Sequence, residues 1–217
     1  MNQEQILQKT RDFVREHLQN DATGHDWWHI FRVWKVSLQL AQEENADLFV
    51  VQLAALLHDI SDWKFSGGDD QKGITISTKW LSSHGVEDDI IQHVCQIIGD
   101  ISYKGAGVAT PMKSVEGMVV QDADRLDAMG AIGIARAFAY GGNKGREMCN
   151  PDVKPLKHQS FEAYKKNQGT TINHFYEKLL LLKDRMNTKT GARIACERHR
   201  VMEEYLTQFM SEWEGIG

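Results

Sequence analysis

His58 and Asp59, two side chains of metal-binding type, stand at the end of the apolar run 53–57. Burying a carboxylate without a partner costs several kcal/mol, so a positive group should lie against this pair. A divalent cation would serve both side chains, because imidazole nitrogen and carboxylate oxygen are both metal ligands. The alternative is an ordinary capped helix end, in which Asp59 or Asp62 faces water and His58 is a buried histidine. These residues alone leave both interpretations open.

A second polar group opens an earlier helix and consists of His25, His29 and Arg32. Residues three and four apart share one face of a helix, so these three side chains project to the same side. Together with the neighbouring tryptophans they would suit an anion or metal pocket. The alternative is a helix start capped by Asp26, with histidines that are half exposed.

Three aspartates, Asp122, Asp124 and Asp127, lie within six residues far downstream, with Arg125 among them. Such carboxylates repel one another unless a cation or an arginine lies between them. A solvated acidic face is the alternative, but the apolar residues on either side favour burial. Asp124 and Asp127 are three residues apart and share a helix face.

Helical periodicity dominates the chain and strand-like alternation is scarce, which predicts an all-α, single-domain helical bundle. The third helix is apolar all round, so it should be central and carry its polar end into the middle of the molecule. The predicted helices span residues 3–18, 26–44, 47–59, 73–84, 87–98, 114–140 (with a kink at 130–133), 170–186 and 191–214.

Two further groups of residues are given structural interpretations. His93 has apolar neighbours and is interpreted as a structural histidine. The cluster Arg193, Arg198, His199 and Arg200 is interpreted as a solvated, salt-bridged face, because glutamates surround it. The loop at 141–159 is longer than most structureless connections and carries Lys144 and Arg146, which is typical of a lid.

Composition narrows the class of protein. The net charge of −5 over 217 residues argues against broad binding to nucleic acid or to an anionic membrane. No apolar run approaches the roughly 20 residues of a membrane helix, and no signal peptide opens the chain. The three cysteines are odd in number and widely spaced, which favours the reducing cytoplasm.

With these motifs in order, the chain resembles the HD-domain superfamily of metal-dependent phosphohydrolases, named for its paired His-Asp. The matching segments are His29 in 24–33, the His58-Asp59 pair, and Asp124 in the Asp-Ala-Asp-Arg-Leu segment 122–126. The resemblance covers an HD core at about 20–135. The C-terminal extension at about 160–217 is similar to that of small stand-alone bacterial HD proteins.

The resemblance implies that His29, His58, Asp59 and Asp124 bind one divalent ion. This mixed nitrogen and oxygen set suits Mn²⁺ first, and also Co²⁺, Ni²⁺, Fe²⁺, Mg²⁺ or Zn²⁺. Two-metal members carry an extra histidine pair, which is missing after 90–98 here. That difference weighs against the diiron oxygenases and the cyclic-dinucleotide phosphodiesterases of the superfamily.

The resemblance further implies hydrolysis of a small phosphorylated metabolite, most of all a nucleotide. Asp59 and Asp62 are the predicted catalytic residues, with Asp62 moving a proton. Nucleoside triphosphate pyrophosphohydrolase and 5′-nucleotidase activities both remain open, and the alternative is a non-catalytic metal- and nucleotide-binding module that acts through a partner. No membrane or nucleic-acid partner is expected, and a homodimer is the assembly considered beside a monomer. The predicted substrate-binding residues are His25, Arg32, Lys64, Lys72, Asp127 and Arg136.

Overall fold

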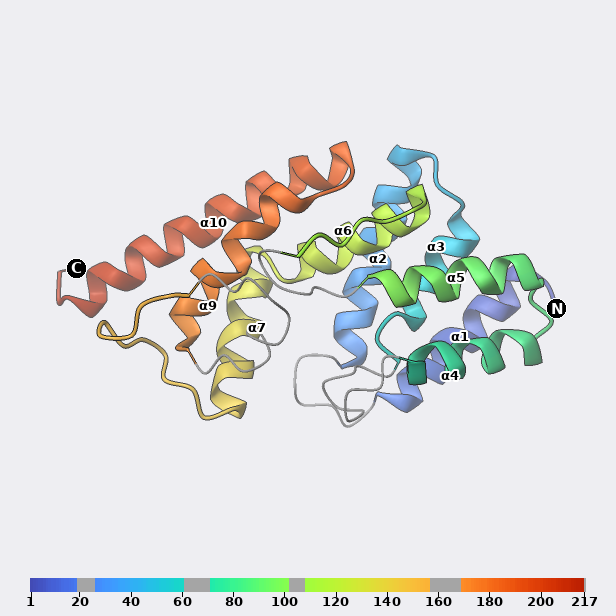
Figure 1. The fold of residues 1–217 in the computed structure, drawn as a ribbon, viewed down its shortest axis with the longest axis horizontal. Coiled ribbons are helices and arrows are strands. Elements are labelled where there is room, and N and C mark those ends of the chain that lie inside the picture. Colours follow the sequence, from blue (N-terminus) through green and yellow to red (C-terminus); the bar gives the residue numbers. More distant parts are fainter. Residues whose placement is uncertain (19–25, 61–70, 102–107, 157–168, 217) are drawn as a thin grey trace. The chain divides into compact units, whose positions relative to one another are not determined.

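The computed structural model describes residues 1–18, 26–60, 71–101, 108–156 and 169–216. The secondary structure of these residues consists of helices joined by turns and loops, with no strand among them (Figure 1). The all-α prediction is confirmed. The chain forms two compact units. The first comprises Met1–Tyr103 and Ala109–Ala123, and the second comprises Lys104–Val108 and Asp124–Gly217. No helix within the described ranges has both the length and the apolar character that crossing a bilayer requires.

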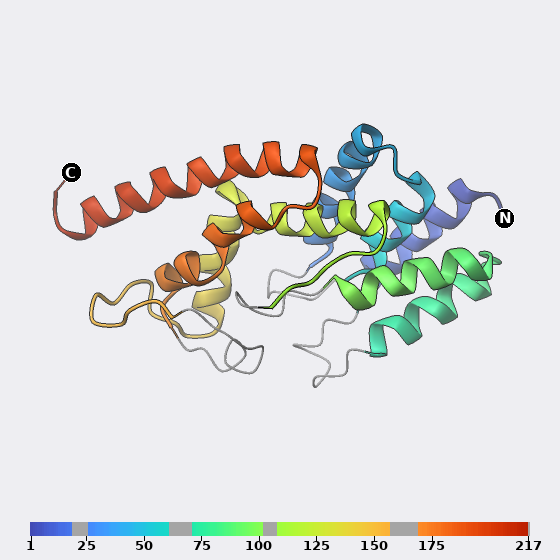
Figure 2. The same cartoon turned by 45° about the horizontal axis from the view of Figure 1, so that its top comes forward.

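The first unit is built around α3, as its apolar composition predicts. This helix, Leu48–Leu57, packs against α1 (Gln3–His17), α2 (Trp27–Glu44) and α5 (Asp88–Asp100). Leu53, Leu56 and Leu57 have no exposed surface, as expected for a helix that is apolar all round. The fourth helix, α4 (Gln71–Ser83), lies antiparallel beside α5 in both views (Figures 1 and 2).

The second unit contains α7 (Gly130–Asn143), α9 (Thr171–Glu177), the 3₁₀-helix η1 (Leu179–Arg185) and the long α10 (Lys189–Trp213). The last helix packs against α7 and η1. Its buried residues Ala195, Met202 and Leu206 recur at helical spacing and form its core face.

The helix predicted over 114–140, with a kink at 130–133, is two separate helices, so the prediction is wrong only in making the helix continuous through the kink. The structure has α6 (Val115–Asp127) and then α7, because Met129 is extended and Gly130 takes a φ of +66°. Gly133 closes the corner tightly, since a Cβ there would lie 2.3 Å from the carbonyl oxygen of Ala128. The last four residues of α6 belong to the second unit.

The single helix expected over 170–186 is also wrong. It breaks at Lys178, whose φ of −141° is not helical, and continues as η1. A 3₁₀-helix has three residues per turn, so Leu179 and Leu182 fall on one line. Both are buried, which explains why the tighter helix suits this leucine run.

The segment predicted as a lid is partly described. The helix α7 extends to Asn143, and residues 144–156 are not helical. The backbone amides of Thr171 and Ile172 donate to the carbonyl oxygens of Glu147 and Met148, at 3.0 and 2.9 Å. These bonds attach the segment to the start of α9, and its role as a lid stays a prediction.

Candidate metal centre

His58 and Asp59 follow directly after the last residue of α3, and contacts at both the start and the middle of this helix fix its position. Asp47 caps its start by accepting from the backbone amides of Phe49 and Val50, at 2.8 and 3.1 Å. The apolar turns are buried, and the helix ends at Leu57. His58 is 9% exposed and the Asp59 side chain 16% exposed, so the chain holds the imidazole inside the protein and the next carboxylate half-buried beside it.

A second histidine reaches the same place from α2. The Asp26 side chain accepts a hydrogen bond of 2.9 Å from the backbone amide of His29, which fixes the first turn of that helix. The His29 side chain is fully buried, and its ring lies 5.3 Å from that of His58, centroid to centroid, with the planes at 68°. The two interpretations of this helix start are therefore compatible: Asp26 caps the helix, and His29 lies beside His58.

The three side chains His29, His58 and Asp59 converge. Each offers one ligand atom, and these atoms all lie within 4.8 Å of one another. The His29 Nε2 and Asp59 Oδ2 atoms are 3.7 Å apart, which is too long for a hydrogen bond between them. A shared cation between imidazole and carboxylate fits this spacing better than a direct bond does.

The tautomer of His58 can be read from its environment. Its Nδ1 atom lies 2.8 Å from the carbonyl oxygen of Ala55 in the last turn of α3. A carbonyl only accepts, so Nδ1 carries the proton and Nε2 of the neutral ring keeps its lone pair. Histidines that bind metals are oriented in this way, with the other ring nitrogen donating to a carbonyl or carboxylate.

The fourth predicted ligand, Asp124, lies in the last turn of α6 and is half-buried. It belongs to the second compact unit, whereas the three converging residues belong to the first. Its place in the metal site stays a prediction, based on the order of the motifs.

The remaining predicted catalytic and substrate-binding residues, apart from Asp127 and Arg136, are only partly described. Asp62, His25 and Lys64 lie outside the described residues. Arg32 is half-buried on α2, three residues after His29, and Lys72 is exposed on the first turn of α4. For these residues the role in binding substrate stays a prediction.

Asp127 and Arg136 form an ion pair with each other in the second unit. The Arg136 Nη1 atom donates to Asp127 Oδ2 at 2.7 Å, and the side chains are 20% and 3% exposed, respectively. Arg125 donates to the backbone carbonyl of Arg185. All three residues therefore hold the end of α6 in place, whatever part they take in substrate binding.

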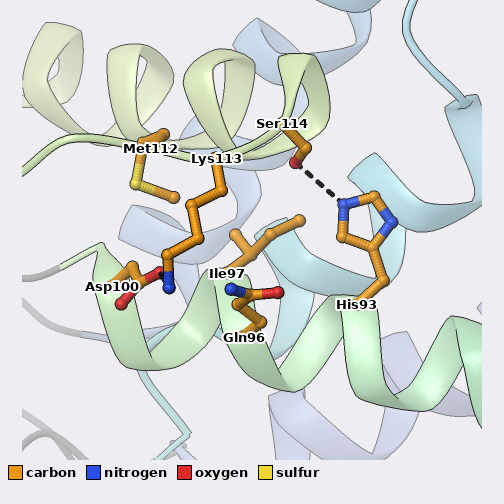
Figure 3. A pocket seen from close by; sticks show the side chains of 7 residues that line it. All are labelled: His93, Gln96, Ile97, Asp100, Met112, Lys113 and Ser114. Atoms are coloured by element: carbon orange, nitrogen blue, oxygen red, sulfur yellow. Dashed lines mark hydrogen bonds and ion pairs between the residues drawn. The ribbon is translucent and has the colours of Figure 1, made fainter.

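The other end of α6 is tied to α5 in the first unit. Nε2 of His93 lies 2.8 Å from the hydroxyl oxygen of Ser114 (Figure 3). The same oxygen accepts a hydrogen bond from the backbone amide of Gly117. Lys113 and Asp100 pair at 3.2 Å beside a hollow of about 90 Å³. That volume is well below the roughly 300 Å³ of a typical small-molecule site. The structural interpretation of His93 is consistent with these contacts.

The interpretation of the basic cluster on α10 is wrong for two of its four residues. Arg193 and Arg200 are exposed, but His199 is buried and Arg198 is half-buried. Arg198 donates to the carbonyl oxygen of Leu126 at 2.5 Å. The buried residues 195, 202 and 206 recur at helical spacing, and position 199 falls on the same buried face of α10. Position 198 lies at the edge of that face. That spacing is the signal in the sequence that would have found them.

Known proteins resemble the chain over almost its whole length. The model of the HD domain family matches residues 27–129, a range that contains the four predicted ligands. An HD-superfamily hydrolase from Bacillus thuringiensis, solved as a crystal structure, is 42% identical, with 98% of this chain and 99% of that chain covered at a TM-score of 0.77. The chain belongs to the HD superfamily. The predicted His-Asp pair of this family, His58-Asp59, supplies two of the three residues that converge.

Two further relatives extend this comparison. A Lactobacillus plantarum protein is 38% identical over 99% of this chain and 100% of its own, with a TM-score of 0.87. YpgQ from Bacillus subtilis is 37% identical over 212 residues, which cover 96% of this chain and 94% of YpgQ. A crystal structure of YpgQ in complex with ADP has a TM-score of 0.76 to this chain, with 97% of this chain and 100% of that chain covered. The Bacillus thuringiensis structure, described as an HD-superfamily hydrolase, supports a hydrolase.

Proposed function

We propose that the protein is a divalent-metal-dependent phosphohydrolase that acts on a nucleotide. The observation that carries this proposal is the convergence of His29, His58 and Asp59 within 4.8 Å, with His58 held in the tautomer that leaves Nε2 for a metal. Membership of the HD superfamily adds the hydrolytic class.

The donor set fits one divalent ion. Two imidazole nitrogens and one carboxylate oxygen, with Asp124 as the proposed fourth ligand, suit Mn²⁺, and also Co²⁺, Ni²⁺, Fe²⁺, Mg²⁺ or Zn²⁺. When bound, such an ion lowers the pKa of water and neutralises charge on phosphoryl oxygens. Burial of His29 and His58 keeps the two imidazoles in fixed orientations, so little reorganisation is needed when the ion binds.

The protein side chains supply the remaining steps. Asp62, three residues after Asp59, is proposed to take a proton from the attacking water or to return one to the leaving group. Arg32, His25, Lys64 and Lys72 are the proposed donors to the phosphate oxygens.

The nucleotide assignment is supported by YpgQ. The crystal structure of YpgQ with ADP is similar to this chain over 97% of this chain and 100% of that chain. Two reactions fit this proposal. One cleaves a nucleoside triphosphate to monophosphate and pyrophosphate, and the other removes phosphate from a nucleoside monophosphate. We also propose a cytoplasmic location, because Cys95, Cys149 and Cys196 are all free thiols.

The experiment that tests the proposal combines metals with substrates. The purified protein is stripped of metal and assayed with Mn²⁺, Co²⁺, Ni²⁺ and Mg²⁺ against nucleoside mono-, di- and triphosphates, and phosphate and pyrophosphate are identified separately. We expect turnover with at least one metal. The variant Asp59→Ala should bind no metal, while Asp88→Ala, which changes an exposed aspartate on α5, should behave as the wild type.

The possible results separate the functions considered above. One bound ion with phosphate or pyrophosphate release supports the proposal. One bound ion without turnover across the whole panel would instead support a non-catalytic binding module. Two bound irons with oxygen uptake would indicate an oxygenase. Gel filtration of the same sample distinguishes the homodimer from the monomer.

A further inference from the structure

The end of α6 and the start of α7 form a tight corner against α10. Gly130 has a φ of +66°, and a Cβ at that position would lie 3.1 Å from Cγ and 3.2 Å from Cβ of Arg198. Only glycine combines this left-handed backbone with so close an approach. The corner and the stem of Arg198 are therefore in direct contact, and both belong to the second unit.

The guanidinium of Arg198 completes the hydrogen bonding at the end of α6. Its Nη1 atom donates to the carbonyl oxygen of Leu126 at 2.5 Å. The backbone amide of Met129 donates to the same oxygen at 3.0 Å. The last carbonyls of a helix have no partner in their own helix and carry partial negative charge, so a cation there stabilises the final turn.

The electrostatic environment keeps Arg198 in this position. Asp127, the last residue of α6, is 2% exposed and bonded to Arg136. Burial lowers the pKa of the Arg198 guanidinium, and the negative charge of Asp127 acts in the opposite direction. A partly desolvated cation whose hydrogen-bond acceptor and counter-charge are both supplied by α6 has little freedom to bind a phosphate instead.

We propose that Arg198 is a positioning residue for the predicted ligand Asp124, through the hydrogen bond to the carbonyl of Leu126. This inference rests on the proposed function, because it takes Asp124 as a metal ligand. Asp124, Leu126 and Asp127 share the last turn of α6, so the turn that Arg198 holds is the one that presents the carboxylate. The C-terminal extension thereby contributes to metal binding without a ligand of its own.

The test measures metal affinity rather than activity alone. The Mn²⁺ dissociation constant is determined by electron paramagnetic resonance for the wild type, Arg198→Met, Arg198→Lys and Arg200→Met, with melting curves for each. Arg200 is the matched control, since it lies two residues further on the same helix and its exposed side chain pairs with Glu204. We expect Arg198→Met to weaken Mn²⁺ binding about 10- to 100-fold, as for other groups that orient metal ligands.

Arg198→Lys keeps one cationic donor and should recover part of the lost affinity, whereas Arg200→Met should bind as the wild type does. A second readout combines Arg198→Met with Asp124→Asn. If Arg198 acts through Asp124, the two losses of affinity are not additive. If Arg198→Met does not fold, Arg198→Lys and its combination with Asp124→Asn provide the same comparison.

The outcomes for the two proposals are distinct. A wild type that binds no Mn²⁺ and turns over no nucleotide with any metal of the panel would overturn the proposed function. If another ion of the panel supports turnover, the dissociation constants of the variants are compared for that ion. Normal binding by Arg198→Met, or a loss that adds in full to that of Asp124→Asn, would overturn the role of Arg198. In that second case the wild type still binds Mn²⁺, and the proposed function stands.

Discussion

The ion pair of Asp127 and Arg136 makes a prediction that separates structural from substrate-binding roles. Replacing Arg136 with methionine keeps a long side chain but leaves the carboxylate of Asp127, 3% exposed, without its bonded cation. Removing one partner of a buried pair typically costs about 3–5 kcal/mol. Because Arg136 is itself 20% exposed and Arg198 remains nearby, we expect a smaller loss, about 2–4 kcal/mol, in the free energy of unfolding.

Urea denaturation followed by circular dichroism measures this loss. With a slope of about 2 kcal/mol per molar urea, the midpoint should fall by about 1–2 M. Arg200→Met again serves as the control, because exposed pairs contribute only about 0–1 kcal/mol. The double variant Arg136→Met with Asp127→Asn should recover stability relative to Arg136→Met, since it removes the buried charge.

A midpoint shift for Arg136→Met no larger than that for Arg200→Met would refute the reasoning. If that variant instead kept its stability and raised the KM for a nucleotide, Arg136 would act as the substrate-binding residue that the sequence predicts. A loss of stability with an unchanged KM would assign the pair to structure alone.

Four further predictions concern individual positions. Gly133→Ala should lower the melting temperature, by a destabilisation of about 1–3 kcal/mol, because its Cβ would overlap a backbone oxygen. Gly142→Ala should raise the melting temperature slightly, through a stabilisation of about 0.5–1 kcal/mol, because a Cβ added there in α7 would meet no atom within 4 Å. Burial raises the pKa of the Cys149 thiol, so iodoacetamide should modify it more slowly near pH 8 than the exposed Cys196, as peptide mapping would report. Asp62→Ala should retain Mn²⁺ and lower kcat, and normal turnover would exclude its proposed proton role.

Much of the fold could be predicted because local signals agree with the tertiary structure. Asp26 and Asp47 cap helices where the sequence places helix starts, and the apolar run after Asp47 is buried. The convergence of His29 with the His58-Asp59 pair also follows from recognising the order of the motifs. In these places residue type, spacing and position along the helix all indicate the same arrangement.

The two wrong helices have a different cause. Helical periodicity continues through both places, so the sequence alone predicts only a kink at 130–133 and no interruption at Lys178. The structure interrupts both helices for reasons of packing: Gly130 lets the chain turn against α10, and η1 aligns Leu179 with Leu182. Contacts with segments far away in the chain override the local preference.

The amino-acid sequence by itself determined the helical class, the caps and the identity of the metal-type side chains, because each depends on residue type and on spacing within one helix. Only the tertiary structure decided that His58 donates through Nδ1 and that Arg198 holds the end of α6. Both are contacts of one donor with one carbonyl oxygen, and such a contact depends on where the backbone lies rather than on which residues surround it.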